Sequence, residues 1–156
     1  MAELSVPFFT NEALARFVSS QGRIVAKVIC HLWQNINNPN EPVEIIDNVE
    51  LQFVDGQKLT ISCNEAGDGL DAINFNYAEA RAELNETFAG KIKLFAVDAS
   101  QTKMWVDVIG RQLIEVKLVK QDEYYKADAL ALNFGEEKRE IAISPLDGLI
   151  IDFYEE

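Results

Sequence analysis

The feature that most constrains the fold is an alternation of apolar and polar residues that occurs twice, once in each half of the chain. The first copy reads VELQFVDG from Val49 to Gly56, and the second reads LALNFGEE from Leu130 to Glu137. Because successive side chains of a β-strand point to opposite faces, this period of two gives each segment one apolar and one polar face. Turn residues follow in both copies. Each copy therefore predicts a β-hairpin whose apolar face must be buried.

The similarity extends beyond the hairpins, because each copy continues through a second strand, a loop that ends in Asp-Gly-Leu, and a third strand. With one residue of adjustment in the turn, the sequence matches Leu51, Phe53, Leu59, Ile61, Ser62, Ile73 and Phe75 with Leu132, Phe134, Ile141, Ile143, Ser144, Ile151 and Phe153. We interpret this as a β-hairpin-plus-strand unit over 49–77 and again over 130–154. Two hypotheses explain it: a duplicated half-domain, or convergence, since any hairpin needs such a pattern.

The remaining segments predict two short helices and further strands. Thr10 is the expected N-cap of a helix that stops at Gly22. Tyr77, Leu84 and Phe88 lie at helical spacing and predict a second helix that ends at Gly90. Strands are expected over 24–33, 43–54 (with a bulge near Asp47-Asn48), 58–63, 70–77, 91–97, 103–109, 112–120, 127–134, 139–144 and 149–153. Strands and helices do not alternate regularly, so a parallel sheet is not expected.

These patterns together predict an α+β fold. We expect mainly antiparallel sheet, with about eight or nine strands and two short helices, in a single domain that spans residues 1–156.

The charge of the chain restricts its partners. Fourteen basic and 26 acidic residues give a formal net charge of -12. Such a field repels nucleic-acid backbones and anionic membrane surfaces, so neither is an expected partner. Two interpretations remain: the acidity confers solubility, or an acidic face binds a protein partner with a basic surface. No signal peptide and no membrane-spanning run is predicted, so we expect a cytoplasmic protein.

The residues that could carry chemistry are few. Cys30 and Cys63 lie in apolar strands and are expected to be buried thiols rather than a disulfide framework. His31 is the only histidine, so no zinc site and no other cofactor is predicted. The acidic loop around Glu65, Asp68 and Asp71 does not have the spacing of a calcium loop and is interpreted as a solvated turn.

Function is expected to depend on aromatic residues, because none of the common nucleotide-binding or hydrolase motifs occurs. We predict a non-enzymatic protein-binding or accessory module. Its size and acidity are those of immunity and inhibitor proteins, and that comparison rests on size and charge alone. The candidate binding residues are Trp33, Trp105, Asp107, Tyr124 and Tyr125. Trp105 is expected to share a strand face with Asp107, and a core position is the alternative for it.

Two other functions stay open. One is a small-molecule carrier or sensor, which would need a pocket between sheet and helix. The other is a hydrolase-type enzyme that uses His31 as its base, although an unflanked histidine in an apolar strand is more often structural.

Overall fold

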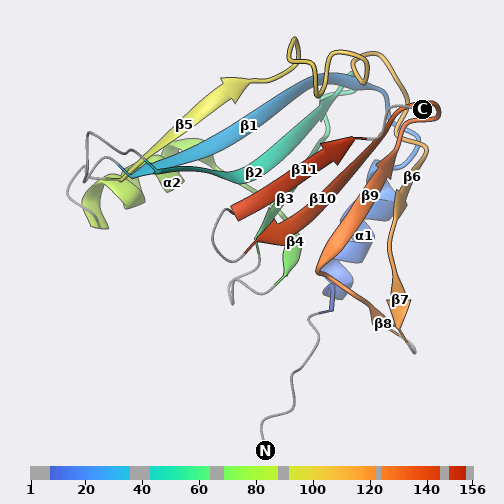
Figure 1. Ribbon diagram of the computed structural model, residues 1–156, viewed down its shortest axis with the longest axis horizontal. Helices are drawn as coiled ribbons and strands as arrows, with labels where there is room; N and C mark the ends of the chain where they lie inside the picture. Colours follow the sequence, from blue (N-terminus) through green and yellow to red (C-terminus); the bar gives the residue numbers. More distant parts are fainter. Residues whose placement is uncertain are drawn as a thin grey trace, which may run out of the picture.

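A computed structural model describes residues 8–35, 43–63, 69–87, 92–121, 124–144 and 148–153 (Figure 1). This part of the chain contains two helices and eleven strands. The helices are α1 (Asn11–Ser20) and α2 (Tyr77–Thr87), and the strands are β1 (Val25–Asn35), β2 (Val43–Phe53), β3 (Lys58–Cys63), β4 (Leu70–Ile73), β5 (Ile92–Asp98), β6 (Glu115–Lys117), β7 (Lys120–Gln121), β8 (Tyr124–Tyr125), β9 (Ala129–Asn133), β10 (Lys138–Ser144) and β11 (Gly148–Phe153).

Nine strands form two antiparallel sections of one branched sheet. The first section has the order β4-β3-β2-β1-β5, and the second has the order β11-β10-β9-β6. A single parallel bridge between Gly148 and Ile46 joins them. Strands β7 and β8 form a separate two-stranded sheet. The predicted α+β class, with mainly antiparallel sheet and two short helices, is confirmed.

Both copies of the alternating pattern fold as three-stranded antiparallel meanders, β2-β3-β4 and β9-β10-β11. Their registers correct the predicted residue matches. Val49 lies opposite Ile61, and Leu130 lies opposite Ile141, so Ile61 and Ile141 are the equivalent positions. Leu59 therefore corresponds to Arg139 and not to Ile141. The duplication itself stays a hypothesis.

The mismatch arises in the turns. The backbone N–H of Phe53 donates to the carbonyl of Gln57, which leaves a loop over 54–56, whereas Phe134 donates to Glu137 and leaves a shorter loop over 135–136. Gly56 and Gly135 have positive φ values of 87° and 95°. Three-residue hairpin loops with a left-handed glycine and two-residue loops that begin with glycine are both common solutions.

Helix α1 lies between the two end strands of the sheet path, β4 and β6. Its N-cap is Thr10 as predicted, whose hydroxyl oxygen accepts a 3.1 Å hydrogen bond from the Ala13 N–H. Arg16 donates to the Ala72 carbonyl of β4, over 2.6 Å, and Gln21 Oε1 accepts from the Val116 N–H of β6, over 2.9 Å. The helix thus satisfies backbone groups on both strands, which would otherwise be unpaired edges.

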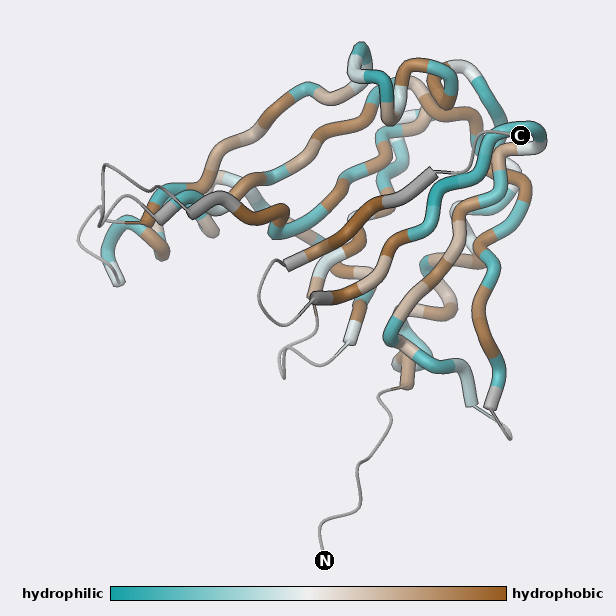
Figure 2. Tube along the Cα trace, viewed as in Figure 1, coloured by the Kyte–Doolittle hydropathy of each residue, from teal (hydrophilic) through white to brown (hydrophobic). Residues whose placement is uncertain are grey.

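The core lies between the two sheet sections and α1. The cluster of buried apolar side chains draws on α1, on β1 to β4 and on β6, β9, β10 and β11. Figure 2 shows apolar residues along these strands. Burial alternates along β4 and β9, so each of them supplies one face to the core as the two-residue period requires, whereas four consecutive residues of β3 are buried.

The expected strand over 103–109 is wrong. This segment is a succession of turns, in which the N–H of Trp105 donates to Thr102 and the N–H of Val108 donates to Trp105. Such i to i+3 bonds give a period of three residues, so Trp105 and Val108 share a buried face. Asp107 is exposed and does not lie on the same face as Trp105.

Other predicted boundaries shift. The segment 70–77 divides into β4 and the start of α2, and 112–120 contains only β6 and the first residue of β7. Phe88, Gly90, Glu65 and Asp68 lie outside the described residues. Neither described helix is long and apolar enough to cross a bilayer.

Candidate functional site

The first sheet section extends beyond the second as an arm formed by β1, β2 and β5, and α2 lies against one face of this arm (Figure 1). Asn76 Oδ1 accepts a hydrogen bond from the Glu79 N–H and begins the helix. The Tyr77 hydroxyl donates to the Leu94 carbonyl of β5, over 3.1 Å, and ties the helix to the sheet. No residue of α2 is buried. The helix therefore covers the sheet loosely and leaves open space along its sides.

One of these spaces is an open groove of about 320 Å³ that combines an indole ring with two carboxylates. Trp33 comes from β1, Asp47 from β2 and Glu83 from α2. The other lining residues are Ala80, Leu84, Thr87 and Leu94. We call this feature the Trp33 groove. In this groove a predicted aromatic candidate, Trp33, and two acidic side chains line the same space.

A β-bulge supplies the carboxylate of Asp47. His31 pairs with Asn48 and Leu32 pairs with Ile46, so Asp47 is the extra residue of β2. This confirms the bulge predicted near Asp47-Asn48. Bulges commonly redirect a side chain out of the regular alternation. Asn48 Nδ2 donates a 2.9 Å hydrogen bond to Asp47 Oδ2, which orients that carboxylate.

The Asp47 charge acts on its surroundings. Burial raises the pKa of the Cys63 thiol, and the nearby Asp47 carboxylate raises it further. The second effect is the one expected when a negative charge opposes the formation of a thiolate. The groove therefore presents a negative potential that would favour a cation.

His31 lies next to this bulge in a buried position, with 3% of its surface exposed. Its Nδ1 is 2.6 Å from Asn48 Oδ1, and its ring lies 4.7 Å from that of Phe75 and 5.2 Å from that of Tyr77. Asn48 Oδ1 must accept, because its Nδ2 already donates to Asp47, so His31 Nδ1 carries the proton. Within the described residues, no serine or cysteine is hydrogen-bonded to His31. This geometry fits the structural role that the sequence favoured.

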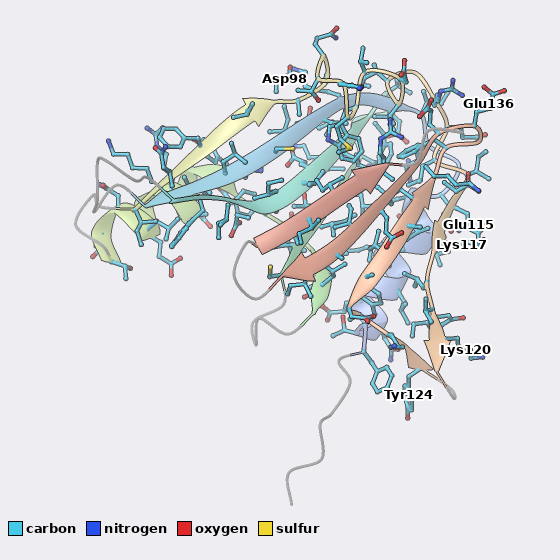
Figure 3. All side chains as sticks on the ribbon, in the orientation of Figure 1. Asp98, Glu115, Lys117, Lys120, Tyr124 and Glu136 are labelled. Atoms are coloured by element: carbon cyan, nitrogen blue, oxygen red, sulfur yellow. The ribbon has the colours of Figure 1, made fainter. Side chains whose placement is uncertain are left out.

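The other predicted binding residues lie elsewhere. Trp105 is 1% exposed and belongs to the core, the alternative left open for it. Tyr124, on β8, is 61% exposed and stacks beside Phe8 with ring centroids 5.3 Å apart. Tyr125 is half-buried beneath Lys120, whose Nζ is 6.0 Å from the ring centroid. Figure 3 shows Tyr124 and Lys120 at the end of the molecule away from α2. The five candidates therefore do not form one surface.

The sequence pattern does not indicate that Asp47 and Glu83 line a groove with Trp33. It predicts only a bulge near Asp47, and on the second helix it indicates the apolar side that contains Leu84. The approach of Asp47 and Glu83 to Trp33 depends on how α2 crosses the sheet, which no local pattern encodes.

Comparison with protein-family models, with curated proteins and with solved structures finds no match to this chain.

Proposed function

We propose that this chain is a non-enzymatic protein-binding module, and that the Trp33 groove takes a lysine or arginine side chain of a basic partner. The observation that carries the proposal is that Trp33, Asp47 and Glu83, from three different elements, line one open groove. Strands β1 and β2 form the floor of the groove, and α2 forms one wall.

The chemistry of the groove fits a cation. A guanidinium or ammonium group over an indole face is stabilised by about 0.5–1 kcal/mol at an exposed site. Two carboxylates can then form charge-assisted hydrogen bonds with the same group, in a geometry that suits arginine best. Aromatic residues and paired charges of this kind are typical of the residues that dominate protein interfaces.

The charge of the whole chain supports the same partner. A net charge of -12 attracts a basic protein over a long range and raises the rate of encounter. Cys30 and Cys63 are both free thiols, which supports a reducing compartment, and we propose the cytoplasm.

The proposal is tested with an acetylated, amidated tetra-arginine peptide as the probe. The double variant Asp47→Asn, Glu83→Gln changes the net charge from -12 to -10, since it neutralises two carboxylates. We expect it to weaken peptide binding by about 2- to 30-fold, the range that two exposed ion pairs supply.

The matched control is Glu12→Gln, Glu136→Gln, which also gives -10 and alters two exposed residues far from the groove. We expect this control to weaken binding by less than about twofold, through the long-range field alone. Equal losses in the two double variants would show that the peptide recognises only the net charge, and the proposal would be wrong.

A further inference from the structure

A second open cleft, of about 330 Å³, lies on the polar face of β2 and β3, between α1 and the chain that leaves β4. The residues that matter in it are Arg16, Glu50, Lys58, Thr60, Asn74 and Phe75. Glu50 and Thr60 lie directly opposite each other in the β2-β3 register. Their neighbours Leu51 and Leu59 point into the core, so the two polar side chains point to the other face.

Glu50 is unusual among the carboxylates in the described part of the chain, because only 6% of its surface is exposed. Its Oε2 accepts a 2.6 Å hydrogen bond from Gln52 Nε2, and within the described residues no side chain forms an ion pair with it. The other oxygen, Oε1, makes no hydrogen bond in this part of the chain and retains contact with the cleft. A buried carboxylate without a cation costs free energy, and a bound ammonium group would remove that cost.

Two cationic side chains border the same cleft at a distance from Glu50. Arg16, on α1, uses one donor on the Ala72 carbonyl, and Lys58 is exposed at the start of β3. Neither Arg16 nor Lys58 forms an ion pair with Glu50. The cleft therefore separates one buried negative charge from two positive charges at its border. Ligand pockets of about 300 Å³ are the smallest that hold a drug-like or metabolite-sized molecule.

We propose that this cleft binds a small zwitterion of the α-amino-acid class. The ligand ammonium lies against Glu50 and the Thr60 hydroxyl, and the ligand carboxylate lies against Arg16 and Lys58. Arginine is the preferred partner of a carboxylate, because its planar group donates two parallel hydrogen bonds. This site is separate from the Trp33 groove and goes beyond the protein-binding function proposed for that groove.

The test uses three probes of similar size: L-alanine, which carries both charges, ethylamine, which carries only the ammonium, and propionate, which carries only the carboxylate. Binding is followed through the backbone amide signals of Thr60 and Asn74 in NMR spectra of the full chain. We expect L-alanine to shift these signals saturably, with a Kd on the order of 1 mM, and the single-charge probes to bind at least about tenfold more weakly.

Variants identify the group that recognises the ammonium. Glu50→Gln keeps the shape of the side chain and is expected to weaken L-alanine binding by about tenfold or more. Glu12→Gln, which removes the same charge from an exposed position of α1, is expected to change it by less than about twofold. The dispersion of each spectrum shows whether the variant is folded.

Three results would overturn the proposal. They are the absence of saturable shifts with L-alanine, binding of ethylamine or propionate as tight as that of L-alanine, and unchanged L-alanine binding by a folded Glu50→Gln variant. This proposal and the one for the Trp33 groove can fail independently. The variant Asp47→Asn, Glu83→Gln leaves this cleft intact and is expected to bind L-alanine as the wild type does.

Discussion

Asn48 fixes the position of its neighbour Asp47 through a 2.9 Å hydrogen bond from Nδ2 to Asp47 Oδ2. The same amide accepts from His31 Nδ1 over 2.6 Å, so one fully buried residue connects the histidine of β1 with the bulge carboxylate at the Trp33 groove. The groove thus has a hydrogen-bonded carboxylate, Asp47, on the sheet side and the Glu83 carboxylate on the helix side. Bracing of this kind lowers the conformational entropy that a binding group loses when its partner arrives.

Replacement of Asn48 by alanine should destabilise the fold. Asn48→Ala leaves the His31 Nδ1–H without its acceptor in a buried position, and it removes the bond to Asp47. We expect the free energy of unfolding, measured by urea denaturation, to fall by about 2–3 kcal/mol. Asn74→Ala, at an exposed position, is the control and should lie within about 0.5 kcal/mol of the wild type. Equal stabilities of the two variants would contradict this role of Asn48.

Arg139 should tolerate an apolar replacement better than truncation. It is 1% exposed at the position equivalent to Leu59, and it donates to the Met104 carbonyl and to Glu137. Arg139→Ala removes these bonds and leaves a cavity, with an expected loss of about 3–5 kcal/mol in the free energy of unfolding. Arg139→Met fills the space and should lose clearly less, about 1–2 kcal/mol, because Glu137 reaches water. Urea denaturation of both variants measures the difference, and an Arg139→Met variant as unstable as Arg139→Ala would argue against the packing role.

The Cys30 thiol should make the fold sensitive to alkaline pH. Burial raises the pKa of Cys30 from 9.0 to about 11, so the unfolded chain loses this proton at lower pH than the folded chain. The resulting stabilisation is complete below pH 9 and is lost as the pH rises towards 11; two pKa units correspond to about 2.7 kcal/mol. Relative to Cys30→Ala, the wild type should lose about 2–3 kcal/mol of unfolding free energy between these values. Parallel pH profiles of the two proteins would show that Cys30 is not protected in this way.

Thr10 should stabilise α1, the helix that forms hydrogen bonds with the two end strands β4 and β6. Thr10→Ala removes the cap bond to the Ala13 N–H, with an expected cost of about 1 kcal/mol in unfolding free energy. Because Gln21 at the other end of α1 accepts from the Val116 N–H, amide hydrogen exchange at Val116 should become faster if the helix frays. Thr10→Ser keeps a capping hydroxyl and should behave almost as the wild type does. A full loss of stability in Thr10→Ser would mean that the methyl group, and not the cap, is what matters.

The sequence predicted those features of the fold that depend on local patterns. The period of two located both meanders, and Thr10 identified the start of α1. The register shift in the β1-β2 pair, which leaves Asp47 as the extra residue, confirms the bulge predicted near Asp47-Asn48. The strand expected over 103–109 failed because Trp105 and Val108 are three residues apart, and a short apolar run fits a period of three as well as a period of two. The equivalence of Leu59 and Arg139 was missed because the lengths of the two hairpin loops decide the register.

The candidate site is harder to predict from the sequence than the fold is. Trp33 was identified, but Glu83 lies 50 residues later in the chain and meets it only through the packing of α2 on β1 and β5. The alternation over Val49 to Gly56 predicts Glu50 only as a polar position of a strand. Asn74 and Phe75, in the chain after β4, lie along the same cleft as Glu50, and their contribution to its burial is a tertiary effect that alternation does not encode.

The central claim, that the Trp33 groove receives a basic side chain, is tested most directly by intermolecular nuclear Overhauser effects between the bound tetra-arginine peptide and the two indole rings. Trp33→Phe assigns the two sets of indole signals. We predict contacts from the arginine side chain to Trp33 and none to Trp105, which is buried in the core. Saturable binding of the peptide without any contact to Trp33 would contradict the claim.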